Sequence, residues 1–188
     1  MSNMNIGLTQ RIFEIKGRLY DTIDHGWYSF LKDHTLTFIP NDINQNFNKI
    51  ADSIDLLIIT GGPDHTLRKQ IETQMIMSVR KLDKPVLGVC NGAFLLTTLF
   101  GGNLILKAKK HHKGFNHQVF YKNEIHEVNS YHTNIISSPP EKTSVIVTDP
   151  DGDCEGFVGD GIAGVVWHPE QMEQPWLPSE INEFIVRA

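Results

Sequence analysis

Two uninterrupted apolar runs, each leading into glycines, constrain the fold of this chain more than any other feature. Residues 55–60 read DLLIIT and lead into Gly61-Gly62-Pro63-Asp64, and residues 85–89 read PVLGV and lead into Cys90. Continuous apolar strands of this kind are typical of a parallel sheet that helices cover on both faces. Helical patterns follow both runs, at about 67–81 and 93–100, and Gly101-Gly102 ends the second. The alternation predicts an α/β fold with a parallel sheet.

The rest of the chain fits one domain that spans residues 1–188, without an internal repeat or linker. Strands are expected at 5–10 and 36–40, a short helix near 24–32, and Asp64 or Thr66 as the N-cap of the helix at 67–81. The second half changes to short strands between turn-rich segments, at 119–121, 125–129, 144–148, 157–158 and 162–166. A closing helix is predicted at 179–186, directly after Pro178.

Composition and charge exclude several classes of function. The formal net charge is −5, so the chain lacks the basic footprint of a nucleic-acid-binding protein. No apolar run approaches the ~20 residues of a membrane span, and residues 1–10 do not resemble a secretion signal. With only Cys90 and Cys154, the sequence favours a reduced, cytoplasmic protein whose thiols are free.

The setting of Cys90 indicates a nucleophile. Gly88-Val89-Cys90-Asn91-Gly92 lies where a strand turns sharply into a helix, and small residues on both sides let such a corner expose its central side chain. The helix start favours thiolate over thiol, and its N–H groups, beginning with that of Asn91, can stabilise an oxyanion. The alternative is a buried structural cysteine, which is the commoner role of a lone cysteine.

A catalytic cysteine needs a base, and His168 is the best candidate among the nine histidines. It ends the apolar strand at 162–166 and precedes Pro169 and Glu170, and in an extended segment residues i and i+2 point the same way. Glu170 can therefore orient the His168 ring. A second group, His111, His112 and His117, lies among lysines and is most simply a solvated loop. A metal site there is the disfavoured alternative, because no cysteine or carboxylate lies nearby at a recognisable spacing.

These residues together resemble the class I glutamine amidotransferases, including the related γ-glutamyl hydrolases. The family's G-x-C-x-G and H-P-E motifs match residues 88–92 and 168–170, its glycine turn matches 61–64, and its N-S-x-H segment matches 129–132. The resemblance implies a flavodoxin-like three-layer sandwich, no cofactor, and a triad of Cys90, His168 and Glu170. It also implies an oxyanion hole from the N–H groups of Gly62 and Asn91, and a glutamyl-binding segment at Asn129, Ser130 and Tyr131.

Two departures bear on the substrate. The family's glutamines four residues after the cysteine and two before the histidine are Phe94 and Val166 here, which puts free glutamine in doubt. The start of the chain, with MNIGLTQR and DHGWYSFL, resembles small γ-glutamyl hydrolases of bacterial surface-polysaccharide pathways, such as those acting on γ-glutamyl-CDP-amidate. The favoured expectation is a free-standing hydrolase of a small-molecule γ-glutamyl amide.

Three alternatives stay open. The chain could be a glutaminase subunit that passes ammonia to a separate synthase, or a catalytically silent binding or scaffold protein. The DJ-1-like proteins also have a cysteine corner, but they usually carry a histidine beside the cysteine, where this chain has Asn91. The sequence does not specify the oligomeric state.

Overall fold

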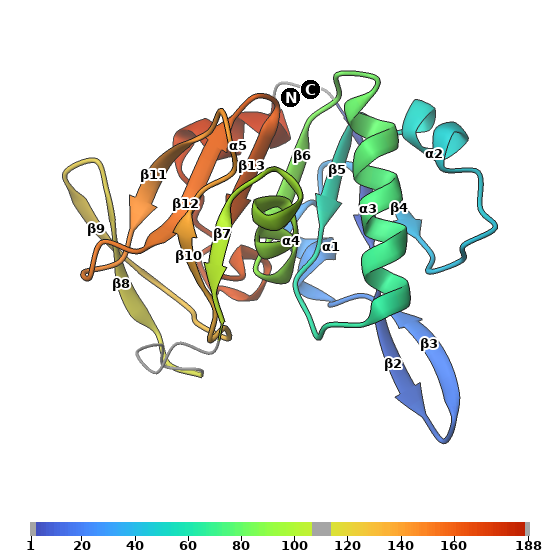
Figure 1. Ribbon diagram of the computed structural model, residues 1–188, viewed down its shortest axis with the longest axis horizontal. Helices are drawn as coiled ribbons and strands as arrows, with labels where there is room; N and C mark the ends of the chain where they lie inside the picture. The colour runs from blue at the N-terminus through green and yellow to red at the C-terminus, as the bar shows by residue number, and fades with distance from the viewer. Residues whose placement is uncertain (1–2, 107–113, 187–188) are drawn as a thin grey trace.

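The computed structural model describes residues 3–106 and 114–186, which form a large mixed sheet with helices on both faces (Figure 1). Five neighbouring strands are all parallel and make up the centre of the molecule. In sheet order they are β4 (Thr35–Ile39), β1 (Asn5–Thr9), β5 (Leu56–Ile59), β6 (Val86–Val89) and β13 (Ile162–Val165). The α/β fold with a mostly parallel central sheet is thereby confirmed.

The helices give this parallel part its three layers. Figure 1 shows α3 (Thr66–Arg80) and α4 (Asn91–Leu99) on one face of the sheet, with α2 (Phe47–Ser53) beside α3. The other face carries α1 (Gly26–Phe30) and α5 (Ser179–Val186). All residues of β5, β6 and β13 are buried, which is what their continuous apolar sequences require.

The second half of the chain extends the sheet with antiparallel strands. β13 pairs in parallel with β6 on one side and antiparallel with β12 on the other. The added strands are β12 (Cys154–Gly159), β11 (Ser144–Thr148), β8 (His117–Tyr121), β9 (Glu124–Val128), β10 (Ile135–Ser138) and β7 (Asn103–Ile105). β13 is thus the strand at which the two kinds of pairing meet.

Several elements differ from the sequence-based expectation. The sequence did not predict α2, β7, β10 or a separate hairpin of β2 (Arg11–Ile15) and β3 (Arg18–Thr22). The hairpin turns at Lys16 and Gly17, which both have positive φ, so that pair was a usable turn signal. The N-cap of α3 is His65, without a side-chain cap, so the prediction of Asp64 or Thr66 was wrong. In the described part of the chain, no helix is long and apolar enough to cross a membrane.

Candidate active site

Cys90 stands at a strained corner between β6 and α4. Its backbone has φ 50° and ψ −107°, a conformation that non-glycine residues rarely adopt. A Cβ at Gly88 would lie 2.6 Å from the backbone of Gly92, and one at Gly92 would lie 2.1 Å from the carbonyl oxygen of Ile59. Both glycines are therefore required by the close packing of the corner, as the G-x-C-x-G pattern predicts.

His168 follows β13, which pairs with β6 so that Val165 lies opposite Val89. The backbone N–H of Cys90 donates to the carbonyl oxygen of Val165 at 2.8 Å. A Cβ placed on Gly61 would lie 2.3 Å from Cε1 of His168 and 3.1 Å from Cβ of Cys90. The thiol-bearing residue, the imidazole and the glycine turn after β5 therefore meet at one point, and the pairing of neighbouring strands holds them there.

Glu170 lies within hydrogen-bond distance of the imidazole. It lies in the short 3₁₀ turn η1 (Pro169–Gln171), and its Oε1 is 2.8 Å from Nδ1 of His168. Burial alone would lower the pKa of His168, but hydrogen bonds and negative charge from Cys90 and Glu170 outweigh it and raise that pKa to about 9. With this raised pKa the imidazole can hold a proton at neutral pH, as a general acid beside Cys90 must.

The other cysteine differs in its surroundings. Both thiols are free, but Cys154 lies on β12, where its Sγ donates to the carbonyl oxygen of Gly156 at 3.7 Å. Burial, and secondarily the charge of Glu155, raise the pKa of Cys154 to about 12. A thiol with this pKa is almost entirely protonated at neutral pH, so Cys154 is a poor nucleophile.

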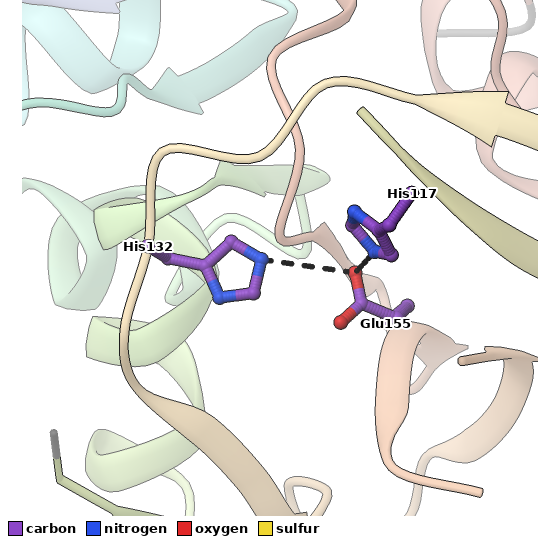
Figure 2. A group of neighbouring side chains, drawn as sticks. All are labelled: His117, His132 and Glu155. Atoms are coloured by element: carbon purple, nitrogen blue, oxygen red, sulfur yellow. Dashed lines mark ion pairs between the residues drawn. The ribbon is translucent and has the colours of Figure 1, made fainter. Parts of the chain in front are cut away.

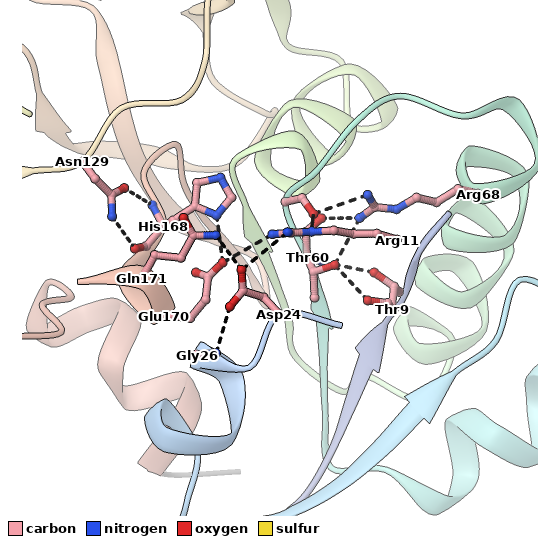
Figure 3. Close-up of polar contacts among 11 residues, drawn as sticks. Thr9, Arg11, Asp24, Gly26, Thr60, Arg68, Asn129, His168, Glu170 and Gln171 are labelled. Carbon is pink, nitrogen blue, oxygen red and sulfur yellow. Dashed lines mark hydrogen bonds and ion pairs between the residues drawn. The ribbon is translucent and has the colours of Figure 1, made fainter. Parts of the chain in front are cut away.

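Arg11, which the sequence did not single out, connects the glycine turn to Glu170 (Figure 3). Its Nε donates to the carbonyl oxygen of Gly61 at 2.8 Å, and its other nitrogens lie 3.8 Å from Glu170 and 3.6 Å from Asp24. Gly62 has φ 135°, and a Cβ there would meet the Arg11 side chain at 2.9 Å. Arg11 therefore fixes the loop that carries the Gly62 N–H.

A pocket of about 630 Å³ opens beside the corner, between α3 and α4. Asn91 and Phe94 line it, together with polar residues of α3 that include Arg68. Phe94 is buried, and its ring makes a T-shaped contact with that of His132, with centroids 5.9 Å apart. An apolar ring thus occupies the position after the cysteine at which the resemblance expects glutamine.

The segment from Asn129 to Tyr131 lies next to His168, but its residues differ in what they contact. The amide of Asn129 donates to the carbonyl oxygen of His168 and accepts its N–H, both at 2.8 Å (Figure 3). Asn129 therefore holds the backbone of the candidate base, and its expected contact with substrate stays a prediction. The buried hydroxyl of Ser130 has no hydrogen-bond partner among the described residues, and Tyr131 is 47% exposed, with its ring in T-shaped contact with that of His168.

A family model for the class I glutamine amidotransferases matches residues 21–188 of this chain. The chain belongs to this family. It is 26% identical over 184 residues to the γ-glutamyl-CDP-amidate hydrolase of Campylobacter jejuni, with 89% of this chain and 90% of that protein covered. It is 29% identical over 134 residues to the pyridoxal 5′-phosphate synthase subunit PdxT of Methanococcus maripaludis, covering 65% of this chain and 72% of that one.

Solved structures of amidotransferases share the fold. A glutamine amidotransferase from Thermotoga maritima superposes with a TM-score of 0.71 at 17% identity, covering 90% of this chain and 77% of that one. Similarity at this level of identity supports the architecture, and the residues of this chain must carry the argument for its chemistry.

One part of this amidotransferase chain was interpreted wrongly from sequence. His117 was assigned to a solvated loop, whereas it starts β8 and lies 3.3 Å from the buried carboxylate of Glu155. No local spacing could reveal this contact, since β11 and β12 bring Glu155 to His117 across the sheet. His111 and His112 lie outside the described residues.

Proposed function

We propose that this protein hydrolyses a γ-glutamyl amide, with Cys90 as nucleophile, His168 as general acid and base, and Glu170 as the group that orients His168. The observation that carries the proposal is the meeting of Cys90 and His168 at the glycine turn, with Glu170 2.8 Å behind the imidazole. Acyl transfer by cysteine requires a nucleophile beside a base, and a carboxylate on the far side of that base to orient it.

In the first step the Cys90 thiolate attacks the γ-carbonyl carbon of the substrate. The N–H groups of Asn91, at the start of α4, and of Gly62 stabilise the oxyanion that forms. The imidazolium of His168 donates its proton to the leaving nitrogen, the C–N bond breaks, and a γ-glutamyl thioester remains on Cys90.

Water completes the cycle. His168, now neutral, takes a proton from water as that water attacks the thioester carbonyl. The C–S bond breaks, glutamate leaves and the thiolate is restored. A mechanism based on a thiolate suits a reducing compartment, which is in keeping with a cytoplasmic location for the protein.

The substrate class follows from the groups around Cys90. We assign to the glutamyl moiety the exposed Tyr131 and the Ser130 hydroxyl, which has no hydrogen-bond partner in the described part of the chain. Phe94 in place of glutamine disfavours free glutamine, and the pocket of about 630 Å³ beside Asn91 leaves room for a leaving group larger than ammonia. The similarity to the Campylobacter jejuni hydrolase along 89% of this chain favours γ-glutamyl-CDP-amidate as the first compound to test.

A second function is favoured by a different relative. The PdxT protein of Methanococcus maripaludis is a synthase subunit, and this chain covers 72% of it. The same triad could release ammonia for a separate synthase that docks on this chain. Such a subunit would depend on its partner for activity, whereas a stand-alone hydrolase would not.

Glutamate release by the purified protein alone distinguishes these functions. The protein is given glutamine, γ-glutamyl-p-nitroanilide or γ-glutamyl-CDP-amidate, with the Cys90→Ala variant as blank. Release from a γ-glutamyl compound exceeding that from glutamine supports the hydrolase. No release from any compound, while iodoacetamide still labels Cys90 rapidly, favours the synthase subunit. Equal release by the Cys90→Ala variant contradicts both.

A further inference from the structure

Three titratable side chains outside the candidate triad come together in the antiparallel half of the sheet (Figure 2). They are His117 at the start of β8, His132 in the segment before β10, and Glu155 on β12. One ligand atom from each lies within 4.8 Å of the others. The side chains of His132 and Glu155 are each 2% exposed and that of His117 is 17% exposed, so the group is closed to bulk water on most sides.

Glu155 is the anion at the centre of this group. Its Oε2 lies 3.3 Å from Nε2 of His117 and 3.9 Å from Nε2 of His132. Among the described residues this buried oxygen has no partner in hydrogen-bond geometry. A buried carboxylate without a hydrogen-bond partner is stabilised by a cation bound next to it.

The orientation of His132 indicates what kind of cation fits. Its Nδ1 lies 3.0 Å from the backbone carbonyl oxygen of Asn134, and because a carbonyl only accepts, Nδ1 carries the hydrogen. In the neutral ring Nε2 then carries a lone pair, and that atom faces Glu155. Histidines that bind metals typically donate their other N–H to a backbone carbonyl or a carboxylate, as His132 does here.

We propose that Nε2 of His117, Nε2 of His132 and the carboxylate of Glu155 bind one zinc ion. Two imidazoles and a carboxylate suit Zn²⁺, whereas Mg²⁺ and Ca²⁺ prefer oxygen ligands alone. Small side-chain rotations bring donors at these separations to the ~2.0–2.2 Å that zinc requires. Three protein ligands leave a fourth position for water.

The ion would join three segments that are distant in the sequence. It would tie β8 and β12 to the segment that contains Asn129 and Ser130, next to the candidate base. The backbone carbonyl of Glu155 also accepts the N–H of Val166, two residues before His168. The zinc site would therefore hold the antiparallel half of the sheet against the candidate active site, whichever substrate is cleaved there.

Metal binding by the whole chain tests the proposal directly. Untagged protein is stripped with a chelator, dialysed against Zn²⁺ and analysed for metal content, and Co²⁺ is added to a second sample for its visible spectrum. We expect one zinc per chain, the absorption bands of low-symmetry four-coordinate Co²⁺, and a higher melting temperature with Zn²⁺. Stripped protein that retains no zinc at micromolar concentration and gives no such spectrum overturns the proposal without any variant.

Variants then locate the ion. His117→Asn should weaken zinc binding at least ~100-fold and remove the gain in melting temperature, because it deletes a ligand. His126→Asn is the matched control, since His126 is also partly exposed and lies 3.2 Å from a glutamate, but outside the group. Equal loss in both variants contradicts the site.

Two further variants test whether Glu155 is a ligand and whether His111 and His112 bind the ion instead. Glu155→Gln should lose zinc; if it does not fold, the Co²⁺ spectra of the wild type and His117→Asn decide alone. If zinc is lost in a His111→Asn and His112→Asn double variant but kept in His117→Asn, the ion binds the neighbouring histidine pair and the proposal is wrong.

Discussion

The two strands that flank β13 carry functional groups of different origin. On one side, β6 leads directly into Cys90, and Gly88, Cys90 and Gly92 form the corner within five consecutive residues. On the other side, β12 brings Glu155 to His117 and His132, which come from two other segments. The first arrangement is a local backbone motif, whereas the second exists only when several strands have paired.

The corner at Cys90 and the antiparallel half of the sheet are therefore expected to contribute differently to catalysis. In the proposed mechanism the corner supplies a buried nucleophile at a strained backbone position, together with the N–H groups at the start of α4. The antiparallel half supplies position, because Asn129 holds the backbone of His168 and Glu155 holds that of Val166. Substitutions in the first part should abolish chemistry, and those in the second should weaken it.

The largest effect is expected at the corner itself. Cys90→Ala should lower glutamate release by more than ~10⁴-fold with an unchanged circular dichroism spectrum, because the nucleophile is lost and the fold is not. Cys154→Ala, the matched control, should change the rate less than about threefold, since its thiol stays protonated. Substantial turnover by Cys90→Ala, or its loss in Cys154→Ala, would place the nucleophile elsewhere.

Next in size are the substitutions at the base and its orienting group. His168→Ala should reduce kcat by ~10³-fold or more, and the loss in Glu170→Ala should be about 100-fold smaller, since Glu170 acts through the imidazole. Both kcat values come from initial rates with saturating γ-glutamyl substrate. The reverse order of losses would contradict the assigned roles.

A smaller effect is expected at Asn129. Asn129→Ala removes two hydrogen bonds to the His168 backbone and should lower the free energy of unfolding by about 1–3 kcal/mol. We expect kcat to fall about tenfold while KM changes less than kcat, because the base is misplaced. Asn116→Ala, which removes only a surface contact with Glu127, is the control. A rise in KM at constant kcat would indicate that Asn129 binds the substrate and does not position His168.

The smallest effect is a displacement of the pH profile. Since His168 has a pKa of about 9 in the folded protein, kcat/KM should fall as pH rises through 9 and the imidazolium is lost. Its folded pKa lies above the ordinary 6.5, so its contribution to stability is full below pH 6.5 and disappears as pH rises towards 9. Glu170→Gln removes a group that raises this pKa and should move the alkaline limb to lower pH. An unmoved limb would mean that another group titrates there.

The sequence predicted most of what local rules determine. The buried strands, the glycine-flanked corner and helix α5 depend on neighbouring residues, and they were found within one or two residues of their observed bounds. The hairpin of β2 and β3, the tie from Arg11 to Gly61 and the grouping of His117 with Glu155 depend on tertiary pairing. Strand order and register decide such contacts, and a single sequence does not reveal them.

The position of β13 has a consequence for how the protein is made. β6 and the Cys90 corner precede β13 and His168 in the chain, so they leave the ribosome earlier. A growing chain therefore carries the candidate nucleophile for some time without the candidate base. The proposed site is complete only when β13 has inserted between β6 and β12, so a chain that ends before His168 should not consume substrate.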